Sequence, residues 1–167
     1  IPLTEIVDPQ GLNMPDKNLS RDPARTPMQW DDTINAGFSS ERPWLGVDRN
    51  YQKINVKVQR QDESSMLSLY RELIHLRSRE PALAVGEYTP VYADHQMLAY
   101  IRSLEEEKNF LVLINFTHRP CFFGQKNHQY KGRVVASTSP ELKGMFVSET
   151  ISLGGDEALV VELDVNI

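Results

Sequence analysis

The stretch SRDPARTPMQWDD, at residues 20–32, is the densest group of polar and aromatic side chains in the sequence. Its backbone is restrained by Pro23 and Pro27. Guanidinium and amide groups bind sugar hydroxyls, and the face of an indole can stack on the C–H surface of a sugar. The same side chains could instead form an internal ion-pair network that holds a loop. The polar and aromatic residues in question are Arg21, Asp22, Arg25, Gln29, Trp30, Asp31 and Asp32.

The surrounding residues 1–61 have no sustained periodicity, and prolines and glycines interrupt them at short intervals. The segment is nevertheless rich in large apolar side chains, including Trp30, Trp44, Phe38 and Tyr51. Long loops without secondary structure are uncommon inside a compact domain. The aromatic content therefore predicts a loop that packs on a surface.

Residues 62–80 form the clearest helical pattern in the chain. Apolar side chains recur there at helical spacing and form one stripe. Asp62 or Ser64 is expected to cap the start, and Pro81 is expected to end the helix. The stripe consists of Met66, Leu69, Tyr70, Leu73 and Ile74.

From residue 86 the apolar period changes to two, which is typical of strands. Polar turns separate the short runs, and no helical pattern lies between them. The sequence therefore predicts an α+β chain whose C-terminal part is an antiparallel β-sandwich. The expected strands cover residues 87–92, 97–104, 110–117, 133–137, 150–153 and 158–163.

Charge and composition exclude several classes of protein. The net charge of −5, with basic residues scattered among acids, argues against a nucleic-acid groove. No apolar run is long enough for a membrane span. Cys121 is the only cysteine, so the chain can form no internal disulfide. We expect no cofactor, no nucleic-acid partner and no membrane partner.

No residue pattern predicts a catalytic centre or a metal site. Asp31 and Asp32 are adjacent, so they cannot be shown to flank a glycosidic bond as a hydrolase pair would. The histidines lack metal-ligand spacing, and Asp8, Asn13 and Asp16 match no calcium loop. Asn115–Thr117 fits the glycosylation pattern but lies in an apolar run, so we treat it as incidental.

The strings RDPARTPMQW at 21–30, NAGF at 35–38 and PWL at 43–45 resemble the loop after the eighth barrel strand of family 13 glycoside hydrolases. The similarity is to the α-glucosidase, oligo-1,6-glucosidase and maltase branch of the α-amylase superfamily. It continues through YRELI at 70–74 and GEY at 86–88.

This resemblance implies a specific organisation. Residues 1–85 would be the last loop and last helix of a (β/α)₈ barrel, and residues 86–167 the C-terminal antiparallel β domain. In that family an Asp nucleophile, a Glu acid and a supporting Asp lie on earlier barrel strands. We therefore expect no catalytic residue in this chain, and a missing N-terminal barrel portion as its partner. The opening at Ile1, without an initiator Met, agrees with a fragment.

The resemblance also implies a substrate-binding role for one arginine. In exo-acting members an Arg of this segment pairs with an upstream Asp and holds the terminal glucose. Arg25 is the first candidate for that position and Arg21 the second. The implied activity of the parent protein is retaining hydrolysis of terminal α-linked glucose from short oligosaccharides, with the chain inactive alone.

Two other interpretations remain open. The inert heavy subunits of amino-acid transporters share this fold and part of the motif, so the chain could belong to such an ectodomain. It could also be a self-standing carbohydrate-binding module, although the β half lacks an exposed aromatic run. We also expect the isolated chain to self-associate, or residues 1–60 to be disordered, because the loop and the apolar stripe would normally bury against the rest of a barrel.

Overall fold

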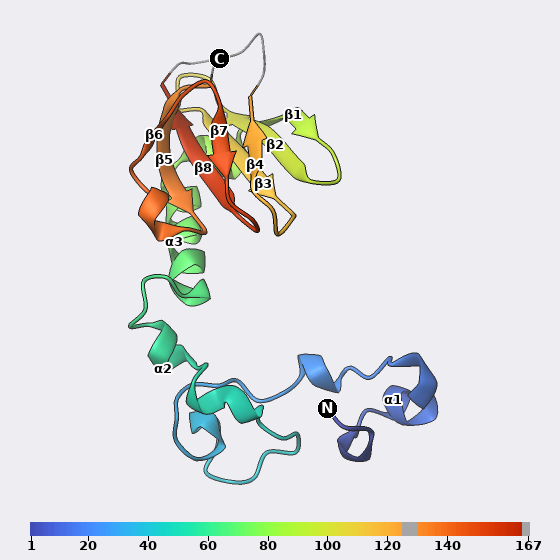
Figure 1. Cartoon of the computed structure of the whole chain (residues 1–167). Helices are drawn as coiled ribbons and strands as arrows, with labels where there is room; N and C mark the ends of the chain where they lie inside the picture. Colours follow the sequence, from blue (N-terminus) through green and yellow to red (C-terminus); the bar gives the residue numbers. More distant parts are fainter. Residues whose placement is uncertain (125–129, 165–167) are drawn as a thin grey trace. The chain divides into compact units, whose positions relative to one another are not determined.

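The computed structural model describes residues 1–124 and 130–164. The chain divides into two compact units, Ile1–Asp62 and Glu63–Ile167, which are described separately below. The first unit is drawn from blue to teal in Figure 1, and the second from green to red. The predicted helix groups with the strands in the second unit, whereas the resemblance assigns it to the barrel.

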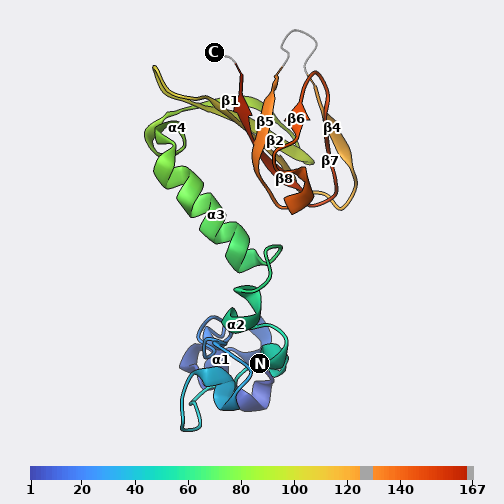
Figure 2. The same ribbon diagram turned by 90° about the vertical axis from the view of Figure 1, so that its left-hand side faces the viewer.

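The first unit consists of short helical turns joined by extended segments (Figures 1 and 2). Prolines begin several of these turns, because proline is tolerated in a first helical turn but not beyond it. The expectation of an irregular segment is therefore met by a series of brief turns. They are η1 (Leu3–Glu5), α1 (Pro9–Asn13), η2 (Pro15–Lys17), η3 (Asp22–Ala24), η4 (Ile34–Gly37), η5 (Arg49–Gln52) and α2 (Val56–Gln59).

The NAGF string forms a turn with an unusual backbone. Asn35, Ala36 and Gly37 all have positive φ, at 52°, 58° and 66°. The Asn35 side chain donates hydrogen bonds to the carbonyls of Ser39 and Glu41 at 3.0 and 2.9 Å. Asn and Gly tolerate this left-handed region better than other residues, which explains why they occur here.

The second unit begins with the long helix α3 (Met66–Arg79), followed by the short helix α4 (Pro81–Val85). The predicted N-cap was wrong: Ser65, not Asp62 or Ser64, accepts the backbone N–H of Ser68 at 3.2 Å. Pro81 ends α3 as predicted, since it begins the next helix at its first position.

Within the part of the chain that the structure describes, the strands form two antiparallel sheets, one of six strands and one of two. The order is β1-β2-β3-β8-β5-β6 in the larger sheet and β4-β7 in the smaller one. The antiparallel prediction is thus confirmed, but β4 and β6 were not foreseen. The strands are β1 (Glu87–Ala93), β2 (Met97–Ser103), β3 (Phe110–Asn115), β4 (Cys121–Phe123), β5 (Gly132–Ser137), β6 (Phe146–Val147), β7 (Ile151–Leu153) and β8 (Ala158–Leu163).

The hydrophobic core lies between the two sheets. Alternate residues of β2, β3 and β8 face β4 and β7 there, as the two-residue period requires. The fully buried members include Leu111, Leu113, Leu153 and Val161. The opposite face of the larger sheet and α3 together line an apolar groove of ≈ 320 Å³. Met66, Tyr70 and Ile74 of the helical stripe remain exposed.

Candidate functional site

The turn that carries the two candidate arginines is held by a pair of carboxylates. Asp8 accepts hydrogen bonds from the backbone N–H of Arg21 at 2.8 Å and from its guanidinium at 2.5 Å. In the opposite direction, Asp22 accepts the backbone N–H groups of Val7 and Asp8 at 2.8 and 3.0 Å. We call Asp8, Arg21 and Asp22 the carboxylate clasp.

The acidic side of the clasp is buried. Both Asp8 and Asp22 are buried. Hydrogen bonds from Arg21 hold the pKa of Asp8 well below its usual range, and in return Asp8 raises the pKa of Arg21. The other carboxylate oxygen of Asp22, Oδ1, is buried and has no hydrogen-bond partner among the described residues. Leaving a buried carboxylate oxygen without a partner costs free energy. The two hydrogen bonds that the other oxygen, Oδ2, accepts from Val7 and Asp8 hold Asp22 in place.

Arg25 is placed differently from Arg21. It follows the turn η3, and its backbone N–H donates to the carbonyl of Asp22 at 2.9 Å. Its side chain is exposed and makes no recorded hydrogen bond or ion pair within the described part of the chain. The clasp thus anchors the backbone of Arg25 and leaves its guanidinium available to an outside carboxylate or hydroxyl pair.

Gln29 and Trp30 connect the motif at residues 20–32 to residues 50–57, near the end of the first unit. The Gln29 side-chain amide donates to Asn50 Oδ1 at 2.9 Å and also to the Ile54 carbonyl. The backbone carbonyls of Gln29 and Trp30 accept the N–H groups of Val56 and Lys57, both at 3.0 Å. These residues therefore brace the loop.

Asp31 and Asp32 are also occupied locally. Asp31 accepts hydrogen bonds from the Thr33 hydroxyl at 2.5 Å and its N–H at 2.9 Å, and these bonds lower the pKa of Asp31. Asp32 pairs with Lys57 at 2.9 Å, which lowers the pKa of Asp32. Asp31 and Asp32 each have a local partner, so they stabilise the turn at Thr33 and the contact with Lys57.

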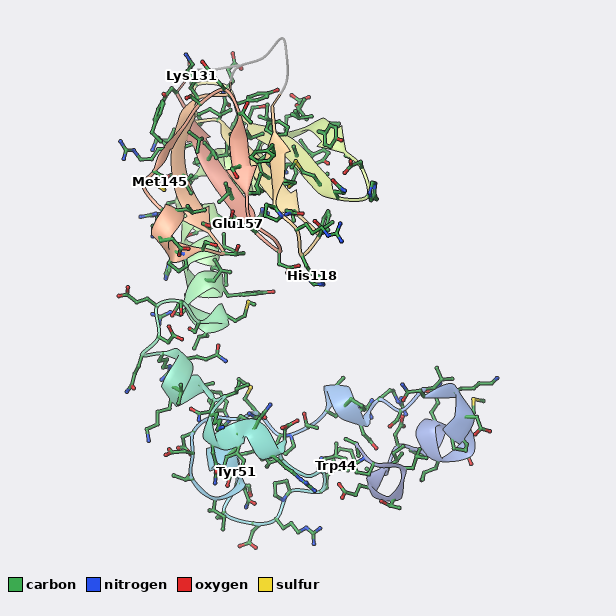
Figure 3. All side chains as sticks on the ribbon, viewed as in Figure 1. Trp44, Tyr51, His118, Lys131, Met145 and Glu157 are labelled. Atoms are coloured by element: carbon green, nitrogen blue, oxygen red, sulfur yellow. The ribbon has the colours of Figure 1, made fainter. Side chains whose placement is uncertain are left out.

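The second unit offers no cluster suited to catalysis among its described residues. Within residues 1–124 and 130–164, no group of His, Cys, Asp and Glu could hold a metal ion. Burial raises the pKa of the Cys121 thiol, which disfavours a nucleophilic thiolate. His118 Nδ1 lies 2.6 Å from Asp156 Oδ2, and that hydrogen bond raises the pKa of the exposed imidazole. His118 lies in the loop between β3 and β4, and Glu157 lies in the loop between β7 and β8 (Figure 3).

The glycosylation pattern at residues 115–117 is structural. Asn115 is only 2% exposed, and its amide nitrogen donates to the carbonyls of Arg119 and Gly154 at 2.8 and 2.6 Å. Its oxygen accepts the N–H of Thr117 at 3.0 Å. The amide is therefore not accessible to a glycosyl transferase in the folded protein.

Asp8 lies outside the motif at residues 20–32, and its sequence pattern suggested only a calcium ligand, which no loop spacing supports. It lies 13 positions before Arg21, and no local spacing rule connects residues that far apart. Charged side chains are seldom buried unless they are paired, so knowledge of its burial would have marked Asp8 as a residue with a partner. Burial cannot be predicted in a segment that lacks a regular apolar period.

Comparison with known proteins agrees with the motif. Residues 1–86 match the family described as "Alpha amylase, catalytic domain". The oligo-1,6-glucosidase of Bacillus cereus is 42% identical over 104 residues, which cover 62% of this chain and 18% of that enzyme. The glucan 1,6-alpha-glucosidase of Streptococcus pneumoniae is 35% identical over 163 residues, which cover 98% of this chain and 28% of that enzyme.

Solved structures give the same result. The trehalulose synthase of Pseudomonas mesoacidophila superposes with a TM-score of 0.86 at 27% identity, covering 98% of this chain and 33% of the synthase. The matched parts thus span between 18% and 33% of the length of these relatives. On the match of its family model over residues 1–86, the chain belongs to the α-amylase family of glycoside hydrolases.

Proposed function

We propose that this sequence forms the end of the catalytic domain and the C-terminal β domain of a retaining α-glucosidase that removes terminal α-linked glucose from short oligosaccharides. In that protein, residues 1–85 would complete the barrel and residues 86–167 would stabilise it. The chain alone would be inactive, since the family's nucleophile and general acid lie on earlier strands. The oligosaccharide substrate and the N-terminal barrel portion are its proposed partners.

The observation that carries this proposal is the contrast between the two arginines. Arg21 is engaged in the carboxylate clasp, whereas the Arg25 guanidinium has no recorded partner in the described residues. A guanidinium on a braced turn can pair with a carboxylate supplied by the barrel and close one end of a sugar pocket. Such a closed end favours a terminal glucose over a unit in mid-chain.

The test uses the complete natural protein that contains this sequence. We expect Arg25→Ala to lower kcat/KM on a chromogenic α-glucoside by roughly 10- to 100-fold, the value of a hydrogen bond to a charged group. Arg42→Ala is the matched control, because Arg42 is exposed and lies outside the motif. Arg21→Ala should lower the stability of the loop, because it removes the ion pair with Asp8. Equal kinetics for the Arg25 and Arg42 variants would contradict the assignment.

A further inference from the structure

A second hollow lies far from the arginine motif in sequence, within the β unit. It is bounded by the β1–β2 turn on one side and by β4 on the other, and it has a volume of ≈ 400 Å³. Small-molecule sites have volumes of roughly 300–1,000 Å³. β1 and the turn after it supply Tyr92, Asp94 and Gln96, and β4 supplies Phe122. We call this space, lined by Tyr92, Asp94, Gln96 and Phe122 above a buried floor, the hairpin hollow.

The floor of the hairpin hollow is part of the hydrophobic core. Met97 and Phe123 line it, and both are core residues, with exposures of 4% and 3%. Such side chains cannot swing outward without disrupting the core. The hollow is therefore part of the folded state of the β unit.

Two aromatic rings form its walls. Phe122 alternates outward on β4 and is 72% exposed, which is unusual for a phenylalanine. Tyr92 comes from β1, and its hydroxyl donates to Asp94 Oδ2 at 2.9 Å. That bond fixes the orientation of the ring before any ligand arrives, which reduces the entropy cost of binding.

The polar groups suit a neutral ligand with many hydroxyls. Asp94 Oδ1 accepts the N–H groups of Gln96 and Met97 at 2.8 and 2.7 Å, so the carboxylate is held firmly. Its Oδ2 has a remaining lone pair for a ligand hydroxyl. The Gln96 side chain is exposed and can both donate and accept. No lysine or arginine lies among the described lining residues, which disfavours phosphate and other anions.

We propose that the hairpin hollow binds a short α-linked glucose oligosaccharide, with its sugar rings against Phe122 and Tyr92 and its hydroxyls on Asp94 and Gln96. This site consists of other residues than the proposed Arg25 pocket and does no chemistry. It would hold substrate chains on the β domain of the parent enzyme. The rings and polar groups of the hollow indicate a neutral sugar, and the choice of α-linked glucose rests on the proposed function.

The experiment is an NMR titration of the isotope-labelled 167-residue protein with maltotriose and isomaltotriose, with glycerol as a polyol control. We expect saturable shift changes for at least one trisaccharide at residues 92–97 and 120–124. Phe122→Ala should weaken binding by roughly fivefold or more, the scale of a lost ring contact. Phe146→Ala is the matched control, since Phe146 is 56% exposed on β6 and does not line the hollow.

A second variant, Gln96→Ala, removes a hydrogen-bonding group while leaving the core untouched, and it should also weaken binding. The absence of saturable changes with both sugars, an equal response to glycerol, or equal affinities for the Phe122 and Phe146 variants would overturn the proposal. Shift changes confined to residues 21–30 would overturn it too, while leaving the proposed function of Arg25 intact.

Discussion

Individual carboxylates of the first unit serve its structure. Asp8 and Asp22 exchange hydrogen bonds across two segments, and Asp31 closes the turn at Thr33. The motif therefore contains the internal ion-pair network that its composition suggested, and Arg25 stands apart from that network. A sugar-binding role for Arg25 is our proposal. The family resemblance ranked Arg25 before Arg21, but the residues alone could not, because the partner of Arg21 is distant in sequence.

The ion pair between Asp8 and Arg21 predicts that the stability of the first unit depends on pH. Since the pKa of Asp8 is lowered on folding, its contribution to stability is present above the unfolded value of about 3.9 and is lost as pH falls towards the folded value. Both tryptophans, Trp30 and Trp44, lie in this unit, so their fluorescence reports on it.

In acid titrations of tryptophan fluorescence, we expect the wild type to lose its native signal only below pH ~4. Asp8→Asn should be less stable at neutral pH and should show a flatter acid profile, because the titrating group is gone. Parallel profiles for the two proteins would show that Asp8 contributes nothing to the acid sensitivity.

Gly37 is a second residue whose role can be measured. Its φ is +66°, and an added Cβ would lie 2.7 Å from Asp31 Oδ1. Gly37→Ala should therefore lower the free energy of unfolding of the first unit by about 1–3 kcal/mol. The matched control is Gly46→Ala, where a Cβ meets no atom within 4 Å. The comparison uses denaturant curves followed by tryptophan fluorescence, and equal midpoints for the two variants would be inconsistent with the turn described here.

At the scale of elements, periodicity predicted the regular structure well where strands and helices were long. The helix and all six predicted strands lie close to their expected positions, namely β1, β2, β3, β5, β7 and β8. β4 and β6 contain only three and two residues, too few to establish a period. The sequence also showed no aromatic run in the β half. Tyr92 and Phe122 lie on different strands, and only the fold brings them to the same hollow.

The helix start gives a test at this scale. The Ser65 hydroxyl accepts the N–H of Ser68, so Ser65→Ala should destabilise the second unit by about 1 kcal/mol. Ser64→Ala, one position earlier, should have a smaller effect. Thermal unfolding followed by far-UV circular dichroism makes the comparison. A larger loss of stability for the Ser64 variant would indicate that Ser64 caps the helix, as the sequence alone suggested.

At the scale of the whole molecule, the two units differ in how they are stabilised. The β unit has a continuous core between its sheets. The first unit instead relies on hydrogen bonds of its loops, and it exposes large side chains that include Trp44, Met28 and Ile34. Trp44 and Tyr51 lie among these turns in Figure 3. Apolar exposure of this extent is typical of a surface that another segment covers.

This difference predicts two separate unfolding transitions. In urea, tryptophan fluorescence should change at a lower concentration than the β-sheet signal in circular dichroism, because cooperative units with fewer buried contacts open first. The isolated chain should also self-associate through its exposed apolar side chains, which sedimentation at increasing concentration would reveal. Coincident transitions in a strictly monomeric protein would instead show one cooperative domain.

The central claim is that this α-amylase-family chain carries substrate-binding and stabilising parts but not the catalytic carboxylates. The most direct measurement is an assay of the purified 167-residue protein on a chromogenic α-glucoside, at high protein concentration and over long incubation. We predict no turnover above the buffer blank. Clear turnover that stays with the protein through repeated purification would contradict the claim, because it would require a nucleophile and an acid within these residues.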